Sequence, residues 1–375
     1  MRILVAMDSF KGSMTSLEAG DAVRDGILSV APEADVTVRP MADGGEGSVY
    51  AVTYGMEGEW VTVPVTGPLG DEVLASYFIT EGKTAYIESA SSSGITLIPQ
   101  DRLDPMTATS RGLGEVIMDA VKRGAAEITV CLGGVAVNDG GSGMLKALGF
   151  KLTDSGGSEI SDGALGLKNL AHIDDSAVAD DIRRCRFVAA SDVTNPLCGP
   201  NGASEVFAPQ KGARPEDIPL MDEWMGRFAD LTRDINPGSD PDKEGSGAAG
   251  GLGFALMSYL GAQRISGAEL IIRKTGLEEI IKGSDIIITG EGHIDRQTVM
   301  GKTCGTVADL ASRCGRKVIA IGGIVTGSAD NYSQYGISEV HEVIRVEEDY
   351  METSKACINL AFTAAELFKD RCLSM

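Results

Sequence analysis

Short apolar segments alternate with helical segments at both ends of the chain, and this alternation restricts the fold more than any other feature. Near the N-terminus, strands are expected at residues 3–7 and 36–41. Between them, Thr15 and Glu18 form a capping-box sequence, which predicts a helix that ends near Val30. The C-terminal quarter repeats this order, with strands at 285–289, 317–323 and 340–346 and helices at 303–313 and 351–372. Strands that alternate with helices indicate a parallel sheet covered by helices on both faces.

The middle of the chain has a different pattern. Apolar segments at 61–65 and 73–80 flank a Gly-Pro-Leu-Gly-Asp turn, which predicts a β-hairpin, and a third antiparallel strand is expected at 84–89. A chain of 375 residues is long enough for two domains. We therefore predict a flavodoxin-like, doubly wound α/β domain with a parallel sheet, formed by residues 1–70 and 285–375. A second, mixed α/β domain is expected as an insertion at residues 71–284.

The charge and the cysteine pattern exclude several classes of protein. The 33 basic and 54 acidic residues give a formal net charge of −21, and a surface of this charge repels nucleic acid and anionic membranes. No apolar segment approaches the ~20 residues of a membrane-spanning helix. The seven cysteines are scattered and form no CxxC pair, which argues against a disulfide framework or a zinc site. We expect a reduced, cytoplasmic protein that is a monomer or a homodimer.

Several carboxylates follow the predicted strands of the flavodoxin-like domain. In a flavodoxin-like sheet with strand order 2-1-3-4-5, the loops at 8–12, 43–47 and 290–295 lie at the same edge, beyond the carboxyl ends of the strands. These loops contain five carboxylates and one amine: Asp8, Asp43, Glu46, Glu291, Asp295 and Lys11. Paired carboxylates suit Mg²⁺ or substrate hydroxyls, and Lys11 with Ser9 suits a phosphate or a carboxylate. Taken alone, each loop is also typical of a capped helix start or a solvated turn.

The inserted domain contains further loops of this kind. The loop at 133–143 follows a predicted strand and holds five glycines around Asn138 and Asp139. Asp192 also follows a predicted strand, where it suits a general base, a metal ligand or an ordinary turn residue. The GxGxxG sequence at 245–250 follows a polar loop, so it is not a dinucleotide fingerprint but a candidate phosphate site at a helix N-terminus. Together, these loops indicate phosphoryl transfer, which needs positioned Mg²⁺, a lysine, backbone N–H groups and a carboxylate.

Seven segments resemble the bacterial type-1 glycerate kinases and keep the order expected of that family. They are DSFKGS (8–13), MADGGEGS (41–48), TSRGLGE (109–115), GGVAVNDGGSGMLKALG (133–149), SDVTNPLCGPNGASEVFAPQKGA (191–213), GSGAAGGLGFAL (245–256) and TGEGHIDRQTVMGKT (289–303). The resemblance implies ATP- and Mg²⁺-dependent phosphorylation of D-glycerate, with 2-phosphoglycerate as the usual product. It also implies a flavodoxin-like domain made from both chain ends. This sequence departs from the family pattern at Val135, Val137 and His293, the last of which replaces an arginine.

The motifs give a hypothesis for the site. The expected catalytic residues are Asp192, our first choice for accepting the hydroxyl proton, Asp295 as second choice, and Lys11. Substrate contacts are expected from Asp8, Ser9, Asp43, Glu46, His293 and Arg296. ATP is expected at Asn138, Asp139, Gly140, Gly141, Lys211, Gly245, Gly247 and Gly250, and Mg²⁺ at Asp192 and Glu291. The alternatives are a kinase for another short hydroxy acid or polyol, a phosphatase or phosphoester lyase, and a non-catalytic nucleotide-binding regulator.

Overall fold

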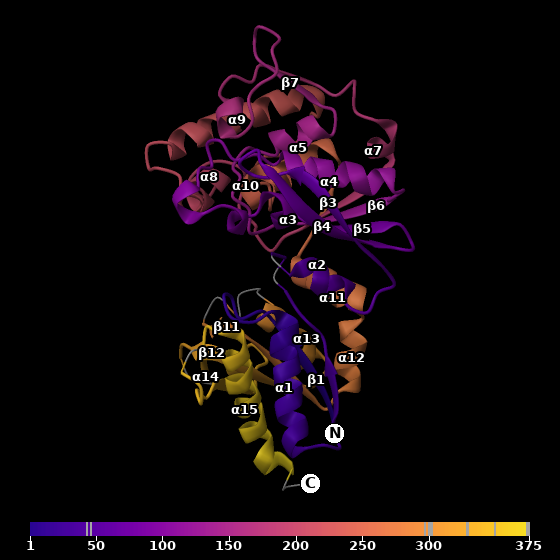
Figure 1. Ribbon diagram of the computed structural model, residues 1–375, viewed down its shortest axis with the longest axis vertical. Helices are drawn as coiled ribbons and strands as arrows, with labels where there is room; N and C mark the ends of the chain where they lie inside the picture. The colour runs from indigo at the N-terminus through magenta and orange to yellow at the C-terminus, as the bar shows by residue number, and fades with distance from the viewer. Residues whose placement is uncertain are drawn as a thin grey trace. The chain divides into compact units, whose positions relative to one another are not determined.

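The chain divides into two compact units in the computed structural model, which describes residues 1–42, 44, 45, 47–295, 298, 303–327, 330–348 and 350–372. The first unit consists of Met1–Asp43, Tyr50–Tyr54 and Gly267–Met375, and the second of Gly44–Val49 and Gly55–Ser266. Both ends of the chain therefore belong to one unit (Figure 1). A short helix, α2 (Ser48–Thr53), has residues in both units.

The first unit is built on a parallel five-stranded sheet. Its strands are β1 (Arg2–Met7), β2 (Asp35–Val38), β11 (Ile286–Ile294), β12 (Lys317–Val325) and β13 (Glu339–Glu342). Their order is β13-β12-β11-β1-β2, and every pair of neighbours is parallel. This is the flavodoxin-like order that the sequence predicts, with β1 between β2 and β11, so the prediction is confirmed.

Helices cover both faces of this sheet. They are α1 (Ser16–Val30), α11 (Gly267–Thr275), α12 (Leu277–Gly283), α13 (Thr303–Arg313), α14 (Asp330–Ser333) and α15 (Thr353–Cys372). The predicted capping box begins α1, because Thr15 Oγ1 accepts from the Glu18 backbone N–H at 3.2 Å. The helices α1 and α15 pack side by side on the face that includes Ile3 and Val5 (Figure 1). Since Leu4, which points to the opposite face, is also fully buried, β1 is covered on both sides.

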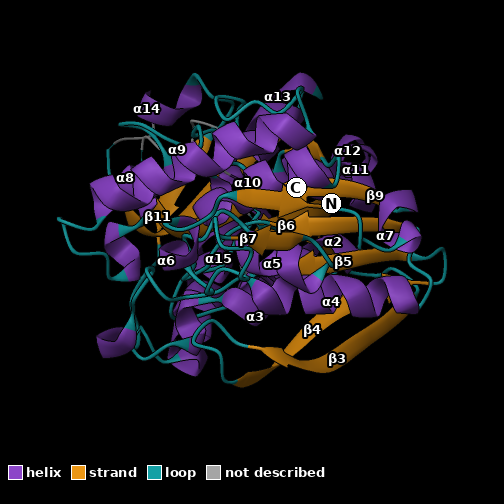
Figure 2. Ribbon diagram, turned by 90° about the horizontal axis from the view of Figure 1, so that it is seen from above, coloured by secondary structure: helices purple, strands orange, loops and turns teal. Residues whose placement is uncertain are grey.

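The second unit contains a mixed six-stranded sheet. Its order is β10-β9-β6-β5-β4-β3, formed by β3 (Gly58–Thr66), β4 (Glu72–Thr80), β5 (Thr84–Glu88), β6 (Glu127–Cys131), β9 (Arg186–Ala190) and β10 (Gln263–Ile265). As predicted, β3, β4 and β5 are antiparallel, and Figure 2 shows β3 and β4 as a long hairpin at one edge. The strands β7 (Lys151–Thr153) and β8 (His172–Asp174) form a separate antiparallel pair.

The helices of the second unit surround one apolar core. They are α3 (Ala90–Ser93), α4 (Arg111–Lys122), α5 (Ser142–Ala147), α6 (Ala164–Leu167), α7 (Asp180–Arg184), α8 (Ala203–Phe207), α9 (Ile218–Ile235) and α10 (Ala248–Tyr259). In the core, the ring of Phe228 packs edge-on against Phe254 and stacks on Tyr259. Among the described residues of either unit, none of the helices is long and apolar enough to cross a membrane.

Some element boundaries differ from the prediction. The strand β11 does not end at Thr289 but continues to Ile294, because Glu291, His293 and Ile294 keep their pairing with β12. The strands β2 and β13 end earlier than predicted. The strand β3, which lies before residue 70, pairs with β4 in the second unit, whereas α11 and α12, which lie before residue 285, belong to the first.

Candidate functional site

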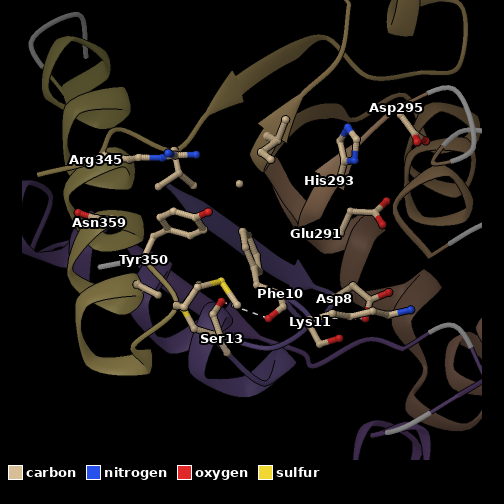
Figure 3. A pocket seen from close by; sticks show the side chains of 18 residues that line it. Asp8, Phe10, Lys11, Ser13, Glu291, His293, Asp295, Arg345, Tyr350 and Asn359 are labelled. Atoms are coloured by element: carbon tan, nitrogen blue, oxygen red, sulfur yellow. Dashed lines mark hydrogen bonds between the residues drawn. The ribbon is translucent and has the colours of Figure 1, made fainter. Parts of the chain in front are cut away.

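A pocket of about 450 Å³ lies within the first unit, beyond the carboxyl ends of the parallel strands. It is formed by the segments that follow β1 and β13, by the last residues of β11 and β12 and by the first turns of α15 (Figure 3). This is where ligands bind in open parallel sheets. The polar residues that line it are Asp8, Ser9, Lys11, Ser13, Glu291, His293, Asp295, Arg345, Tyr350 and Asn359.

Asp8 is held at the end of β1 by the neighbouring strand. Its backbone N–H donates to the Gly290 carbonyl at 2.8 Å, and its Oδ1 accepts from the Ser9 N–H at 2.6 Å. The chain then turns through Gly12, whose φ of +83° is the left-handed conformation that glycine adopts most readily. The Asp8 side chain is nearly buried, and the exposed Lys11 follows in the same turn. A carboxylate and an amine therefore enter the pocket from one short loop.

The extension of β11 supplies further pocket residues on the same side as Asp8 (Figure 3). Glu291 and His293 have the same parity along the strand, so both side chains point to one face of the sheet. His293 Nε2 lies 2.8 Å from Thr326 Oγ1. Asp295 comes just after the strand, where its Oδ1 accepts from the Thr298 N–H at 3.2 Å. The strand thus orders two pocket side chains that the sequence predicts in a loop, and Asp295 follows directly after it.

Asp8 and Glu291 lie on the same side of the pocket (Figure 3), and both act on the buried thiol of Cys304. Burial raises the pKa of Cys304 well above its usual value, and the negative charges of Glu291 and Asp8 raise it further. Two carboxylates from neighbouring strands are suitable ligands for Mg²⁺, which usually binds one or two carboxylates together with water and substrate phosphates. Among the residues with described positions, no group of three or more His, Cys, Asp or Glu side chains could hold a metal ion.

Arg345 and Tyr350 belong to the pocket, but the sequence analysis did not select them. Arg345 falls inside the strand predicted at 340–346, whereas β13 ends at Glu342 and leaves Arg345 in the following loop. The rule that ligands bind beyond strand ends would have selected it, had the end of this strand been predicted correctly.

The residues predicted to bind ATP lie in the second unit, and several of them are buried. Asp139 is fully buried and accepts hydrogen bonds from the Ser110 N–H, the Ser110 hydroxyl, the Gly141 N–H and the Gly143 N–H, at 2.8–3.2 Å. Burial raises the pKa of Asp139 above its usual value, and these hydrogen bonds offset only part of that rise. Asp139 therefore joins the start of α4 to the start of α5 from inside the unit.

Asn138 and Lys211 are buried beside this network. Asn138 Nδ2 donates to Ser204 Oγ at 2.9 Å, and Lys211 Nζ donates to the Val137 carbonyl at 2.6 Å. Burial lowers the pKa of Lys211 to about 8, although the charge of Asp139 acts in the opposite direction. In this conformation the three side chains stabilise the glycine-rich loop from within.

The glycines of the predicted ATP loops allow close packing between backbones. The Gly140 N–H donates to the Gly250 carbonyl at 3.0 Å, and the Gly247 N–H donates to the Asn195 carbonyl at 2.9 Å. A Cβ at Gly250 would lie 2.1 Å from the Val137 carbonyl oxygen, which no side chain could tolerate. The loops at 133–143, 192–202 and 245–250 therefore form one packed assembly.

The predicted site residues thus fall into two groups. The first unit holds Asp8, Ser9, Lys11, Glu291, His293 and Asp295 in the pocket of Figure 3. The second unit holds Asn138, Asp139, Gly140, Gly141, Asp192, Lys211, Gly245, Gly247 and Gly250. Asp192 follows β9 and is partly buried. The predicted contacts Asp43, Glu46 and Arg296 lie outside the described residues.

Comparison with known proteins gives consistent matches along the whole chain. A family model described as the glycerate kinase family matches residues 3–370. Over 345 residues the chain is 42% identical to a glycerate kinase of Bacillus subtilis (strain 168), covering 92% of this chain and 90% of the relative. It is also 42% identical to a glycerate 2-kinase of Escherichia coli (strain K12), covering 92% and 91%. A crystal structure of a candidate glycerate kinase 2 from Salmonella typhimurium LT2 is 40% identical, with a TM-score of 0.88 over 100% of this chain and 99% of that chain.

Proposed function

The chain belongs to the glycerate kinase family, and on this premise we propose that it transfers the terminal phosphoryl group of ATP to D-glycerate. The proposed products are 2-phosphoglycerate and ADP, and the proposed metal is Mg²⁺. The observation that carries the proposal is the extent of the family match, which spans residues 3–370 and so includes every loop that we assign to the site.

The pocket of the first unit suits the acceptor. Asp8 and Glu291 supply carboxylate oxygens for substrate hydroxyls or for Mg²⁺, and Lys11 with Ser9 suits a carboxylate or the transferring phosphoryl group. When bound, Mg²⁺ would neutralise charge on the phosphates. His293 is proposed as a further substrate contact from the same pocket. Asp43, Glu46 and Arg296 are proposed as substrate contacts from the sequence alone.

The loops of the second unit are proposed to bind ATP, mainly through backbone groups. The polar side chains that the sequence predicts for ATP binding, Asn138, Asp139 and Lys211, are buried. In this conformation they stabilise the loop and are not exposed for contacts with ATP. Asp192 is the proposed general base, because it is partly exposed at a strand end and a carboxylate can accept the hydroxyl proton. Asp295 is the second candidate for this role.

A coupled assay of ADP release tests the reaction against its alternatives. The purified protein would be supplied with ATP and Mg²⁺ and, in separate reactions, with D-glycerate, L-glycerate, lactate, tartronate or glycerol. We expect ADP release to be fastest with D-glycerate and to stop when the divalent metal is chelated. Faster turnover of another acceptor would indicate a kinase for a different hydroxy acid or polyol. ATP binding without turnover of any acceptor would indicate a regulator.

Phosphorus NMR of the product identifies the phosphorylated carbon. In 2-phosphoglycerate the phosphorus couples to the single proton on C2, so the signal is split into a doublet. In 3-phosphoglycerate it couples to the two protons on C3. A doublet is expected, and a signal coupled to two protons would contradict the proposed product.

A further inference from the structure

Arg345 enters the pocket of the first unit as a cation that forms no ion pair within the described part of the chain. It lies in the loop after β13 and is exposed to the cavity. Its guanidinium carbon lies 4.5 Å from the centroid of the Tyr350 ring, a distance typical of a cation–π contact. No ion pair joins it to any acidic residue among those that the structure describes. The Tyr350 ring lies beside the guanidinium, but it carries no negative charge to pair with it.

The backbone on both sides of Arg345 is fixed to α15. The Ile344 N–H donates to Thr363 Oγ1 at 2.8 Å, and the Val346 N–H donates to Asn359 Oδ1 at 2.8 Å. Asn359 also accepts from the Glu347 N–H at 2.7 Å and donates to the Glu347 carbonyl at 2.9 Å. Asn359 and Thr363 are each only 1% exposed. The loop is therefore held by buried groups, and the guanidinium is not used to hold it.

The charges of the pocket are separated. Figure 3 shows Asp8, Glu291 and Asp295 on one side and Arg345 on the other, with Phe10 between them. An anionic group is attracted to the arginine and repelled by the acidic side, whereas hydroxyl groups can donate to the carboxylates. A small hydroxy acid carries both kinds of group. Arginine also binds a carboxylate through two parallel N–H···O bonds, which lysine cannot do.

We infer that Arg345 binds the carboxylate of the hydroxy-acid substrate and so determines that an acid, rather than a neutral polyol, is selected. This inference rests on the proposed glycerate kinase activity. It assigns the carboxylate to Arg345 and leaves Lys11, on the acidic side of the pocket, for the transferring phosphoryl group. Asn359 then acts as a positioning residue for Arg345.

The test is Arg345→Gln, which removes the charge and keeps a side chain of similar polarity. Because Arg345 is exposed, the melting temperature should not change. Losing a charge-assisted pair should lower kcat/KM for D-glycerate by about 10- to 100-fold, with KM for ATP within about twofold of the wild-type value. The affinity for D-glycerate, measured by isothermal titration calorimetry, should fall by a similar factor. Arg345→Lys should recover part of the loss, since it restores the charge but not the bidentate geometry.

The control is Arg313→Gln, which removes a surface arginine of the same unit that pairs with Asp309 outside the pocket. It should leave both KM values unchanged. The inference is overturned if Arg345→Gln raises KM for ATP and leaves glycerate binding intact, because the guanidinium would then bind phosphate. It is also overturned if neither value changes. If the wild-type protein does not phosphorylate glycerate at all, the proposed function fails instead, and the two failures are distinct.

Discussion

The Nζ atom of Lys211 donates a 2.6 Å hydrogen bond to the carbonyl oxygen of Val137, inside the second unit. Burial lowers the pKa of this amine from 10.5 to about 8. Between these two pH values the unfolded chain binds a proton at this site that the folded chain has lost. The free energy of unfolding should therefore rise with pH through this window, whereas below about pH 8 the full cost of burying the charge is present.

The first prediction concerns Lys211→Met. This change should remove the rise in the free energy of unfolding with pH. Between pH 8 and 10.5, the free energy of unfolding should therefore increase by about 3 kcal/mol more in the wild type than in the variant. Both tryptophans, Trp60 and Trp224, belong to the second unit, so tryptophan fluorescence during urea unfolding reports on this unit. Lys168→Met, at an exposed position of the same unit, should keep the wild-type slope. An unchanged slope in Lys211→Met would show that the buried amine is not the titrating group.

Asp139→Asn should destabilise the second unit by about 3 kcal/mol. The amide has one acceptor oxygen, and its NH₂ group would face N–H groups that the carboxylate now accepts from. The measurement is the same fluorescence-monitored unfolding. Asp154→Asn is the matched control, because Asp154 accepts from the Gly156 and Ser158 N–H groups in an exposed turn. It should cost less than about 1 kcal/mol, and an equal loss in the two variants would contradict the importance of the buried network.

Gly290→Ala should disrupt the sheet of the first unit. A Cβ at this position would lie 2.1 Å from the Ile321 carbonyl oxygen, and β11 and β12 would have to separate. We expect a loss of about 2–3 kcal/mol and faster hydrogen–deuterium exchange in peptides from these two strands. Gly283→Ala is the control, because a Cβ at this position would have no other atom within 4 Å. Hydrogen–deuterium exchange in β11 and β12 should be unchanged in this variant. Normal protection in Gly290→Ala would show that the strands can adjust.

Asp192→Asn tests the proposed general base. If this carboxylate accepts the hydroxyl proton, kcat should fall by about 10²- to 10⁴-fold while the affinity for ATP is kept. Asp175→Asn, at an exposed position that pairs with Arg183, controls for the loss of a carboxylate from the same unit. Near-normal turnover would remove Asp192 from the mechanism. The same measurement on Asp295→Asn would then decide whether the second candidate takes its place.

Much of the fold could be predicted because the decisive signals are local. Thr15 and Glu18 lie three residues apart and form their capping box without help from the rest of the chain. The end of β11 could not be predicted, because Gly290 and Gly292 are typical of loops. Only pairing with β12, a partner distant in sequence, keeps these residues in the strand.

In the candidate site, too, some features could be predicted from the sequence and others depend on distant parts of the chain. Asp8, Lys11 and Glu291 could be grouped in advance, because parallel strands bring their carboxyl ends to one edge. Asn138 and Asp139 show the limit, because a polar side chain in a glycine-rich loop looks the same whether it contacts a ligand or fixes the loop. Their complete burial distinguishes the two roles in this conformation: Asn138 contacts α8 and α9, and Asp139 accepts hydrogen bonds at the starts of α4 and α5.

The pairing of β1 with β11 affects how the protein is made as well as how it is held together. The Thr289 hydroxyl donates to the Ala6 carbonyl at 2.8 Å, and these residues are 283 positions apart in the chain. Ribosomes add roughly 5–20 residues per second, so β1 waits on the order of 15 to 60 seconds for its partner strand. Throughout that time its apolar residues have no sheet partner on that side, while the second unit can already fold. In nascent chains of this protein, this side of the first strand is therefore expected to stay unpaired until synthesis is nearly complete.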